Sequence, residues 1–147
     1  MARKRVLIVD ENDDFLDGLV SWLTEQRGLD VMGRAHSGME AVDRAQRLSP
    51  DLVLMNISLK DMSGFDAVRL LKASQPAPKV LLMTFHESRA ALIAAFAAGA
   101  DGCVSKAGVT EGLARAIEAV LGPDGVQGTA SADARVDIVW GGTDDSA

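Results

Sequence analysis

The chain alternates five times between a short apolar run and a longer amphipathic segment, and this alternation constrains its fold more than any other feature. The runs that we expect to be strands cover residues 5–10, 29–35, 51–56, 79–84 and 102–106. Those at 5–10, 51–56 and 79–84 are wholly apolar between polar ends. Apolar runs of this length are typical of strands that are buried on both faces of a sheet.

The segments between the runs carry apolar residues at helical spacing. Helices are predicted at residues 13–27, from 37 to just before Pro50, around residues 65–71, at 88–98 and at 110–121, with Thr110 as the cap of the last one. Strands that alternate with helices predict a parallel sheet with right-handed crossovers and helices on both faces. We therefore expect a doubly wound α/β fold of strand order 2-1-3-4-5, with a ligand crevice at the carboxyl ends of the first and third strands.

Length and composition divide the chain into a folded body and a tail. Its 147 residues suit one domain, which we place at residues 1–122. Residues 123–147 are rich in Gly, Ala, Ser and Asp, so a mostly disordered acidic tail is predicted there. Within the tail, residues 135–140 (RVDIVW) alternate like a strand, which leaves an added strand as the alternative.

The apolar stretches of the chain are too short for a targeting signal or a membrane span, which favours a cytoplasmic protein. The apolar residues 6–9 are too few for a signal peptide, and the longest apolar stretch, residues 90–100, is too short to span a bilayer. A single cysteine, Cys103, excludes an intramolecular disulfide and gives no cysteine metal site. The net charge of −6 argues against direct nucleic-acid binding, although much of it lies in the tail and the body is nearly neutral.

Polar residues stand where the predicted strands end. Asp10 and Glu11 end the first strand, Asn56 the third, Thr84 the fourth and Lys106 the fifth. Taken singly, they have simpler explanations, as acids in a loop or at a helix start, a capping hydroxyl and a solvated lysine. Because the carboxyl ends of parallel strands share one edge of the sheet, we expect all five side chains to converge in one crevice.

Such a set of side chains suits a metal ion and a phosphoryl group. Asp10 and Glu11 are hard oxygen ligands of the kind Mg²⁺ prefers, and the side chain of Asn56 with the backbone carbonyl of Ser58 would complete the shell. The Thr84 hydroxyl can donate a hydrogen bond to a phosphoryl oxygen.

The remaining member, Lys106, supplies a compact positive charge that can balance the acids or a phosphate. Together these groups would position and neutralise a phosphoryl group during its transfer.

Five stretches carry a resemblance to a known family. They are residues 6–11 (VLIVDE), 50–59 (PDLVLMNISL), 61–64 (DMSG), 80–84 (VLLMT) and 99–106 (GADGCVSK). In order and spacing they resemble the receiver domain of two-component response regulators, from about residue 5 to 121. Residues 84–86 (TFH), and a lysine followed by Ala-Gly in place of proline, look most like receivers that precede LuxR-type helix-turn-helix domains.

The resemblance implies a flavodoxin-like fold and a role in phosphorelay signal transduction. It also implies Mg²⁺ at Asp10, Glu11 and the third-strand position, with phosphate contacts from Thr84 and Lys106. The phosphate would come from a histidine kinase or a phosphotransfer protein. An output protein would be controlled through the surface of the helix at 88–98, the strand at 102–106 and the helix at 110–121.

The acceptor position departs from the family pattern. Receivers take phosphate on an aspartate where this chain has Asn56. An amide has the shape of a carboxylate without its charge, and it cannot form an acyl phosphate, so the chain as written is expected to be blocked and to bind Mg²⁺ only weakly. Either Asn56 is an engineered lock on a normal receiver, or it is natural and the chain is a pseudo-receiver that regulates a partner by protein contact alone.

Three smaller departures adjoin the site. Lys60 stands where the family often has proline, which predicts a more mobile loop, and Phe85 replaces a small residue and would narrow the crevice mouth. Cys103 replaces the aromatic switch residue and is predicted to be a buried small hydrophobe.

Two further hypotheses are disfavoured. One is a truncated transcription regulator, which is disfavoured because the roughly 25 residues after the last helix are too few for a helix-turn-helix domain. A small hydrolase with an aspartate nucleophile would need an acid at position 56. We therefore expect a signalling domain and not an enzyme.

Overall fold

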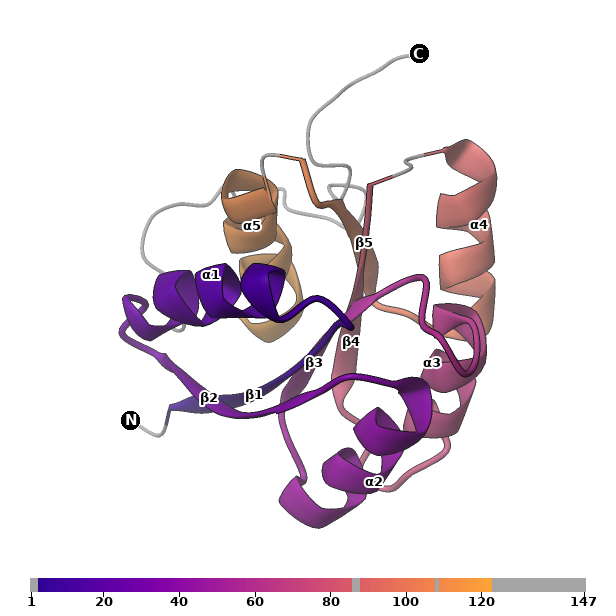
Figure 1. The fold of residues 1–147 in the computed structure, drawn as a ribbon, viewed down its shortest axis with the longest axis horizontal. Helices are drawn as coiled ribbons and strands as arrows, with labels where there is room; N and C mark the ends of the chain where they lie inside the picture. The colour runs from indigo at the N-terminus through magenta and orange to yellow at the C-terminus, as the bar shows by residue number, and fades with distance from the viewer. Residues whose placement is uncertain (1–2, 86–87, 108, 123–147) are drawn as a thin grey trace.

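The structure is a computed structural model that describes residues 3–85, 88–107 and 109–122, and it is built around one parallel sheet (Figure 1). The strands are β1 (Lys4–Val9), β2 (Leu29–Ala35), β3 (Leu52–Asn56), β4 (Lys79–Thr84) and β5 (Gly102–Ser105). Their order is β2-β1-β3-β4-β5, and every neighbouring pair is parallel. The predicted doubly wound α/β fold and its strand order are confirmed.

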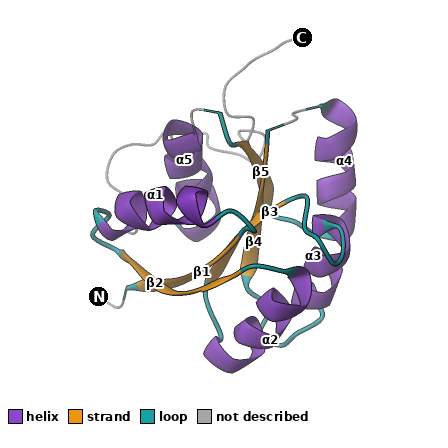
Figure 2. Ribbon diagram, in the orientation of Figure 1, coloured by secondary structure: helices purple, strands orange, loops and turns teal. Residues whose placement is uncertain are grey.

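Helices cover both faces of this sheet (Figure 2). On one face lie α1 (Asp13–Thr24) and α5 (Val109–Leu121), and on the other lie α2 (Gly38–Leu48), α3 (Gly64–Lys72) and α4 (Arg89–Ala98). Successive residues of a strand point to opposite faces. Leu7 and Val9 therefore belong to the core under α2, α3 and α4, while Val6 and Ile8 belong to the core under α1 and α5.

Side-chain caps set the starts of four helices. The side-chain oxygens of Asn12, Ser37, Ser63 and Ser88 each accept a hydrogen bond from the backbone N–H three residues on. Gly99 ends α4 with a φ of 109°, a left-handed conformation that favours glycine.

Two local predictions were wrong. The first helix ends at Thr24 and not at residue 27, because residues 25–28 turn the chain so that Leu29 can enter β2. The last helix begins at Val109, so Thr110 lies inside it and is not its cap. On α3 (Gly64–Lys72), Leu71 and Val68 are buried, whereas Leu70 is 46% exposed.

One prediction lies outside the described residues, and two others can be compared with the structure. The tail, including residues 135–140, lies outside them. None of the helices in the described ranges combines the length and apolar character needed to cross a bilayer. Cys103 is 1% exposed, which confirms the prediction of a buried residue.

Candidate functional site

Strand register brings the predicted site residues to one edge. Val9 pairs with Met55, Asn56 with Met83, and Thr84 with Ser105. At the carboxyl edge, therefore, Asp10 follows β1 beside Asn56 of β3, and Lys106 follows β5 beside Thr84 of β4. The residues expected to form the crevice therefore lie at the edge where the doubly wound topology predicts it.

The centre of the crevice is an ion pair between Asp10 and Lys106. The Lys106 Nζ lies 2.6 Å from Asp10 Oδ2, and the side chains of Lys106 and Asp10 are 5% and 3% exposed respectively. The other carboxylate oxygen, Oδ1, accepts a 3.0 Å hydrogen bond from the backbone N–H of Asn12. Both oxygens of Asp10 therefore have partners, as a buried carboxylate requires.

Two aromatic rings flank the same ammonium. The Nζ of Lys106 lies 4.2 Å from the ring centroid of Phe15 on α1 and 4.9 Å from that of Phe85, which follows β4. Cations at this range are attracted to the negative face of an aromatic ring. The sequence predicts that Phe85 narrows the mouth of the crevice. In the structure its ring lies over the ammonium of the buried Lys106.

Asn56 does not interact with this pair through any contact that the structure records. Its Nδ2 donates a 2.7 Å hydrogen bond to the backbone carbonyl of Ser58. That carbonyl is the one predicted to complete a metal shell. The amide therefore uses as its acceptor an oxygen that is predicted to bind metal, which a carboxylate at this position could not do.

Thr84 and Glu11 complete the predicted set. Thr84 is 4% exposed, and its backbone carbonyl accepts a 2.7 Å hydrogen bond from the N–H of Lys106, which joins the ends of β4 and β5. Glu11 is exposed at the rim. The residues predicted from the sequence thus share one edge, with Asp10, Thr84 and Lys106 buried and Glu11 at the surface.

The oxygen atoms predicted to bind Mg²⁺ fit a bound dication poorly in this arrangement. Asp10 is bonded to Lys106 and Asn12, and the Ser58 carbonyl is bonded to Asn56. Across the described ranges, no group of three His, Cys, Asp or Glu residues could hold a metal ion. A dication would have to compete with the internal partners of the Asp10 carboxylate and the Ser58 carbonyl.

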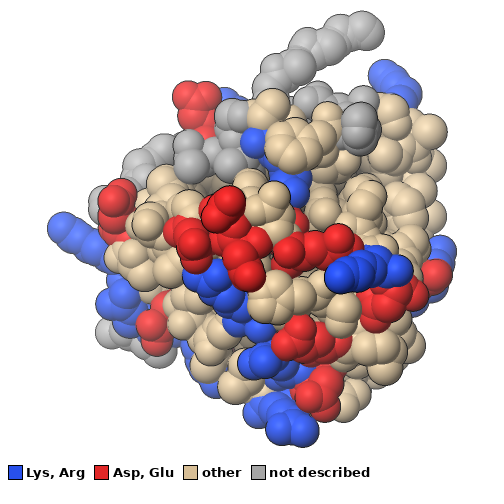
Figure 3. Space-filling view, viewed as in Figure 1, with Lys and Arg blue, Asp and Glu red and all other residues tan. Residues whose placement is uncertain are grey.

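Acidic side chains gather beside the crevice, around the start of α1 (Figure 3). Asp13 accepts from His36 Nε2 at 2.7 Å, and this hydrogen bond is the main reason why the pKa of Asp13 lies below its usual value. Asp17 accepts from Arg34 at 2.6 Å, and the same bond raises the pKa of Arg34. These exposed pairs tie the end of β2 to α1.

The loop after β3 is fastened to α2 by Asp61. Its two carboxylate oxygens accept from the backbone N–H groups of Gly38 at 2.8 Å and Met39 at 3.0 Å. These bonds lower the pKa of Asp61, the one from Met39 most strongly. Sequence reasoning missed both this contact and Phe15, because an exposed loop acid and an apolar helix residue carry no signal for a distant partner.

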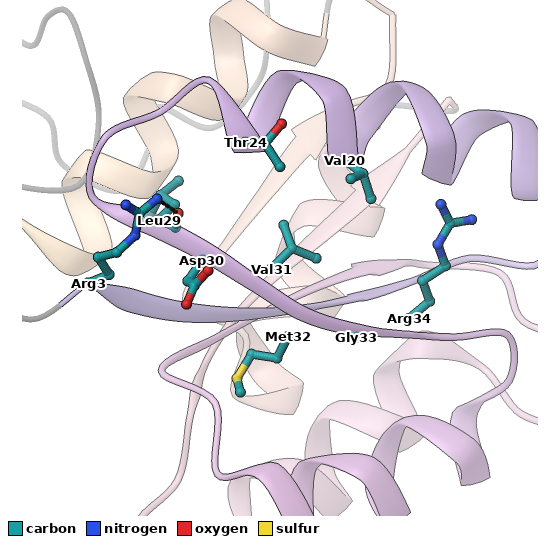
Figure 4. Close-up of a pocket in the computed structure, with 9 residues that line it drawn as sticks. All are labelled: Arg3, Val20, Thr24, Leu29, Asp30, Val31, Met32, Gly33 and Arg34. Carbon is teal, nitrogen blue, oxygen red and sulfur yellow. Dashed lines mark hydrogen bonds between the residues drawn. The ribbon is translucent and has the colours of Figure 1, made fainter.

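A separate hollow of about 320 Å³ lies between α1 and the outer strand β2 (Figure 4). Arg3 and Arg34 stand at its two ends, with Val20, Thr24 and Val31 among the side chains between them. None of the residues predicted for phosphate or metal lines it. The hollow is therefore distinct from the strand-end crevice.

Comparison with known proteins gives one family. The model of the response regulator receiver domain matches residues 6–118. The transcriptional regulatory protein LnrK of Bacillus subtilis is 33% identical over 116 residues, which are 79% of this chain and 53% of the relative. The response regulator protein VraR of Staphylococcus aureus is 34% identical over 113 residues, 77% of this chain and 54% of the relative. The chain thus spans about half the length of the curated relatives that it matches.

Solved structures agree with this comparison. A two-component response regulator of the LuxR family from Aurantimonas sp. SI85-9A1 aligns with a TM-score of 0.77 at 30% identity, covering 82% of this chain and 86% of that one. The signal receiver domain of the putative response regulator NarL from Mycobacterium tuberculosis aligns with a TM-score of 0.70 at 25% identity, covering 73% and 86%. Family match, fold and strand-end residues agree, and the chain belongs to the response regulator receiver domains of two-component signal transduction.

Proposed function

We propose that this chain is a phosphorelay receiver whose acceptor position is residue 56 and whose reaction is blocked by Asn56. With an aspartate at that position, it would take a phosphoryl group from a histidine kinase or a phosphotransfer protein. One observation supports this most strongly: strand register puts residue 56 between Asp10 and Thr84, with Lys106 next in line.

The chemistry follows from these neighbours. A carboxylate oxygen at position 56 would attack the phosphorus of a phosphohistidine, the P–N bond would break, and the imidazole would leave with the electron pair. Thr84 would donate to a phosphoryl oxygen, and Lys106 would neutralise its charge. The amide of Asn56 is too weak a nucleophile for this step, so we expect a signalling domain without catalytic turnover.

A second candidate is a pseudo-receiver that binds a partner without phosphate. The observation that favours it is the internal satisfaction of the crevice, in which Lys106 holds Asp10 and Asn56 holds the Ser58 carbonyl. A site whose polar groups are bonded to one another suits a domain with one fixed signalling state.

Metal binding belongs to the same proposal. We place a weak Mg²⁺ site at Asp10, Glu11, the Asn56 side chain and the Ser58 carbonyl. Binding would be weak because Asn56 removes one negative charge and because two of these oxygens must first give up internal partners.

The partner surface is proposed to be the face formed by α4, β5 and α5. On α4, Ile93 is 63% exposed and Phe96 is 36% exposed, so this helix offers apolar area to an output protein. LnrK is named a transcriptional regulator, and an output domain of that kind is a proposal here. We propose no direct nucleic-acid or membrane contact for the domain at residues 1–122, and the cytoplasmic location stays a prediction.

Phosphorylation by small donors tests the main proposal. The chain and its Asn56→Asp and Asn56→Ala variants would be incubated with acetyl phosphate or phosphoramidate and Mg²⁺, and intact masses measured. We expect a gain of one phosphoryl group in the Asn56→Asp variant alone. A stable gain in the chain as written would contradict the block, and an Asn56→Asp variant that folds but stays unlabelled would favour the pseudo-receiver.

A further inference from the structure

Lys106 lies in an enclosure made by three side chains. Asp10 contributes a carboxylate oxygen at 2.6 Å, and Phe15 and Phe85 contribute ring faces at 4.2 and 4.9 Å. The lysine as a whole is 9% exposed, although lysine is among the residues that are rarely buried without a partner. This enclosure places a positive charge at the centre of the crevice.

Asp10 needs such a charge. Its residue is 2% exposed, and an ionised carboxylate at that depth is very unfavourable without a cation or several hydrogen-bond donors. The structure records one backbone donor, the N–H of Asn12, and one cationic partner, Lys106. Lys106 therefore supplies the charge compensation that a metal ion would otherwise bring.

We propose that the Lys106 ammonium is the resident cation of this crevice and holds Asp10 in place of a divalent metal. Phe15 and Phe85 are positioning residues that keep the ammonium on Asp10. Asn56 favours the arrangement because its uncharged amide bonds to Ser58 and offers Lys106 no competing carboxylate. The inference concerns the resting crevice and does not depend on whether the Asn56→Asp variant accepts phosphate.

Competition for Asp10 follows from this arrangement. The oxygen at which Lys106 binds, Oδ2, is an oxygen that a metal ion would need, so one cation excludes the other. Removal of the ammonium leaves Asp10 buried with an uncompensated charge, which a dication can then neutralise. Lys106 thereby lowers the metal affinity of the crevice. This effect adds to the loss of affinity caused by Asn56, which lacks the negative charge of an aspartate.

The test compares Mg²⁺ binding and metal-dependent stability of the chain with those of a Lys106→Met variant. Methionine keeps most of the length of the side chain and removes its charge. We expect Lys106→Met to melt at lower temperature without metal, to recover stability as Mg²⁺ is added, and to bind Mg²⁺ at least about tenfold more tightly, since a unit charge at close range opposes a dication strongly. Lys79→Met is the matched control, because Lys79 is exposed at the opposite end of the sheet.

A second variant covers the case in which Lys106→Met does not fold. Phe85 is 63% exposed, so Phe85→Leu leaves the core intact and removes one ring from the ammonium. We expect its Mg²⁺ affinity to rise about two- to fivefold, the range of an exposed cation–π contact. A purely structural role for the ring would lower stability equally at all Mg²⁺ concentrations. The proposal is wrong if neither variant binds Mg²⁺ more tightly than the chain, or if the chain itself binds Mg²⁺ at micromolar concentration.

Discussion

The ammonium of Lys106 and the carboxylate of Asp10, 96 positions apart in the sequence, meet at 2.6 Å with almost no exposure to solvent. Buried pairs of this kind add little net stability relative to apolar residues of the same shape, because both charges must be desolvated. Breaking the pair from one side is far more costly, since a buried charge is left alone. The pair therefore fixes the geometry of the crevice more than it stabilises the fold.

Asp10→Asn should lower the free energy of unfolding by about 3 kcal/mol, because it leaves the Lys106 ammonium buried without a counter-ion. Urea denaturation at pH 7 measures this loss. The double variant with Lys106→Met should lose less than the sum of the two single variants, as expected for residues in contact.

Asp30→Asn serves as the control for this pair, because Asp30 is exposed on the outer strand β2 and should change stability by less than about 0.5 kcal/mol. A loss below about 1 kcal/mol for Asp10→Asn would contradict the interpretation of a buried charge pair.

Asn56→Asp should tighten Mg²⁺ binding, which we expect only at millimolar concentrations in the chain as written. The new carboxylate adds a negative charge, and at an effective dielectric constant near 20 a unit charge about 4 Å away contributes roughly 4 kcal/mol before desolvation. It also cannot donate to the Ser58 carbonyl as the Asn56 amide does. Magnesium titrations followed by NMR at Asp10 and Glu11 provide the measurement, and equal affinity in both forms would exclude residue 56 as a ligand.

Gly64→Ala should destabilise the domain by about 1–3 kcal/mol through overpacking. A Cβ at this position would lie 2.8 Å from the carbonyl oxygen of Ile57 and 2.9 Å from its Cα, and both atoms belong to the backbone. The close approach exists because the N–H of Gly64 donates to that same carbonyl at 2.8 Å.

Gly18→Ala is the matched control for Gly64→Ala. Gly18 lies within α1 with no atom within 4 Å of an added Cβ, so alanine there should stabilise the helix by about 0.5–1 kcal/mol. Thermal unfolding of both variants should therefore shift in opposite directions.

Periodicity predicted the parallel sheet and the shared edge of the site, because buried strands and helical spacing are local properties of the sequence. The strand order was then inferred from the doubly wound fold class. Thr84 and Lys106 could be placed in one crevice on topology alone. The partners within the crevice could not be predicted in this way. That Lys106 bonds to Asp10, and that Phe15 from α1 lies over its ammonium, depends on how a helix packs on the sheet.

The helix ends also include one feature that the sequence predicts and one that it does not. Ser88 could be recognised as a cap from its own chemistry, whereas α5 begins one residue before the predicted Thr110. Likewise, the burial of Leu71 and the exposure of Leu70 depend on which side of α3 packs on the sheet.

A chain that ends at residue 122 should keep its melting temperature within a few degrees of the full chain. Among the described residues, the two hydrophobic cores extend no further than Leu121, so we expect the removal of residues 123–147 to leave both intact. Calorimetry of both forms measures the difference. A larger drop would mean that Val136, Ile138 or Trp140 packs on the body.

Asp61→Asn should weaken the domain at neutral pH and have almost no effect in acid. The backbone N–H groups of Met39 and Gly38 hold the pKa of Asp61 below its usual value of about 3.8. A carboxylate whose pKa is lower in the folded state stabilises the fold above its unfolded pKa, and this stabilisation disappears as the pH falls through the folded value. Because Asp61 is exposed, screening limits the effect to about 0.5 kcal/mol near pH 7. Urea midpoints of the chain and the variant should therefore differ at pH 7 and converge as the pH falls through the lowered pKa of Asp61, whereas Asp30→Asn should show no such convergence. A constant difference across this range would mean that the two bonds to α2 do not depend on the charge of Asp61.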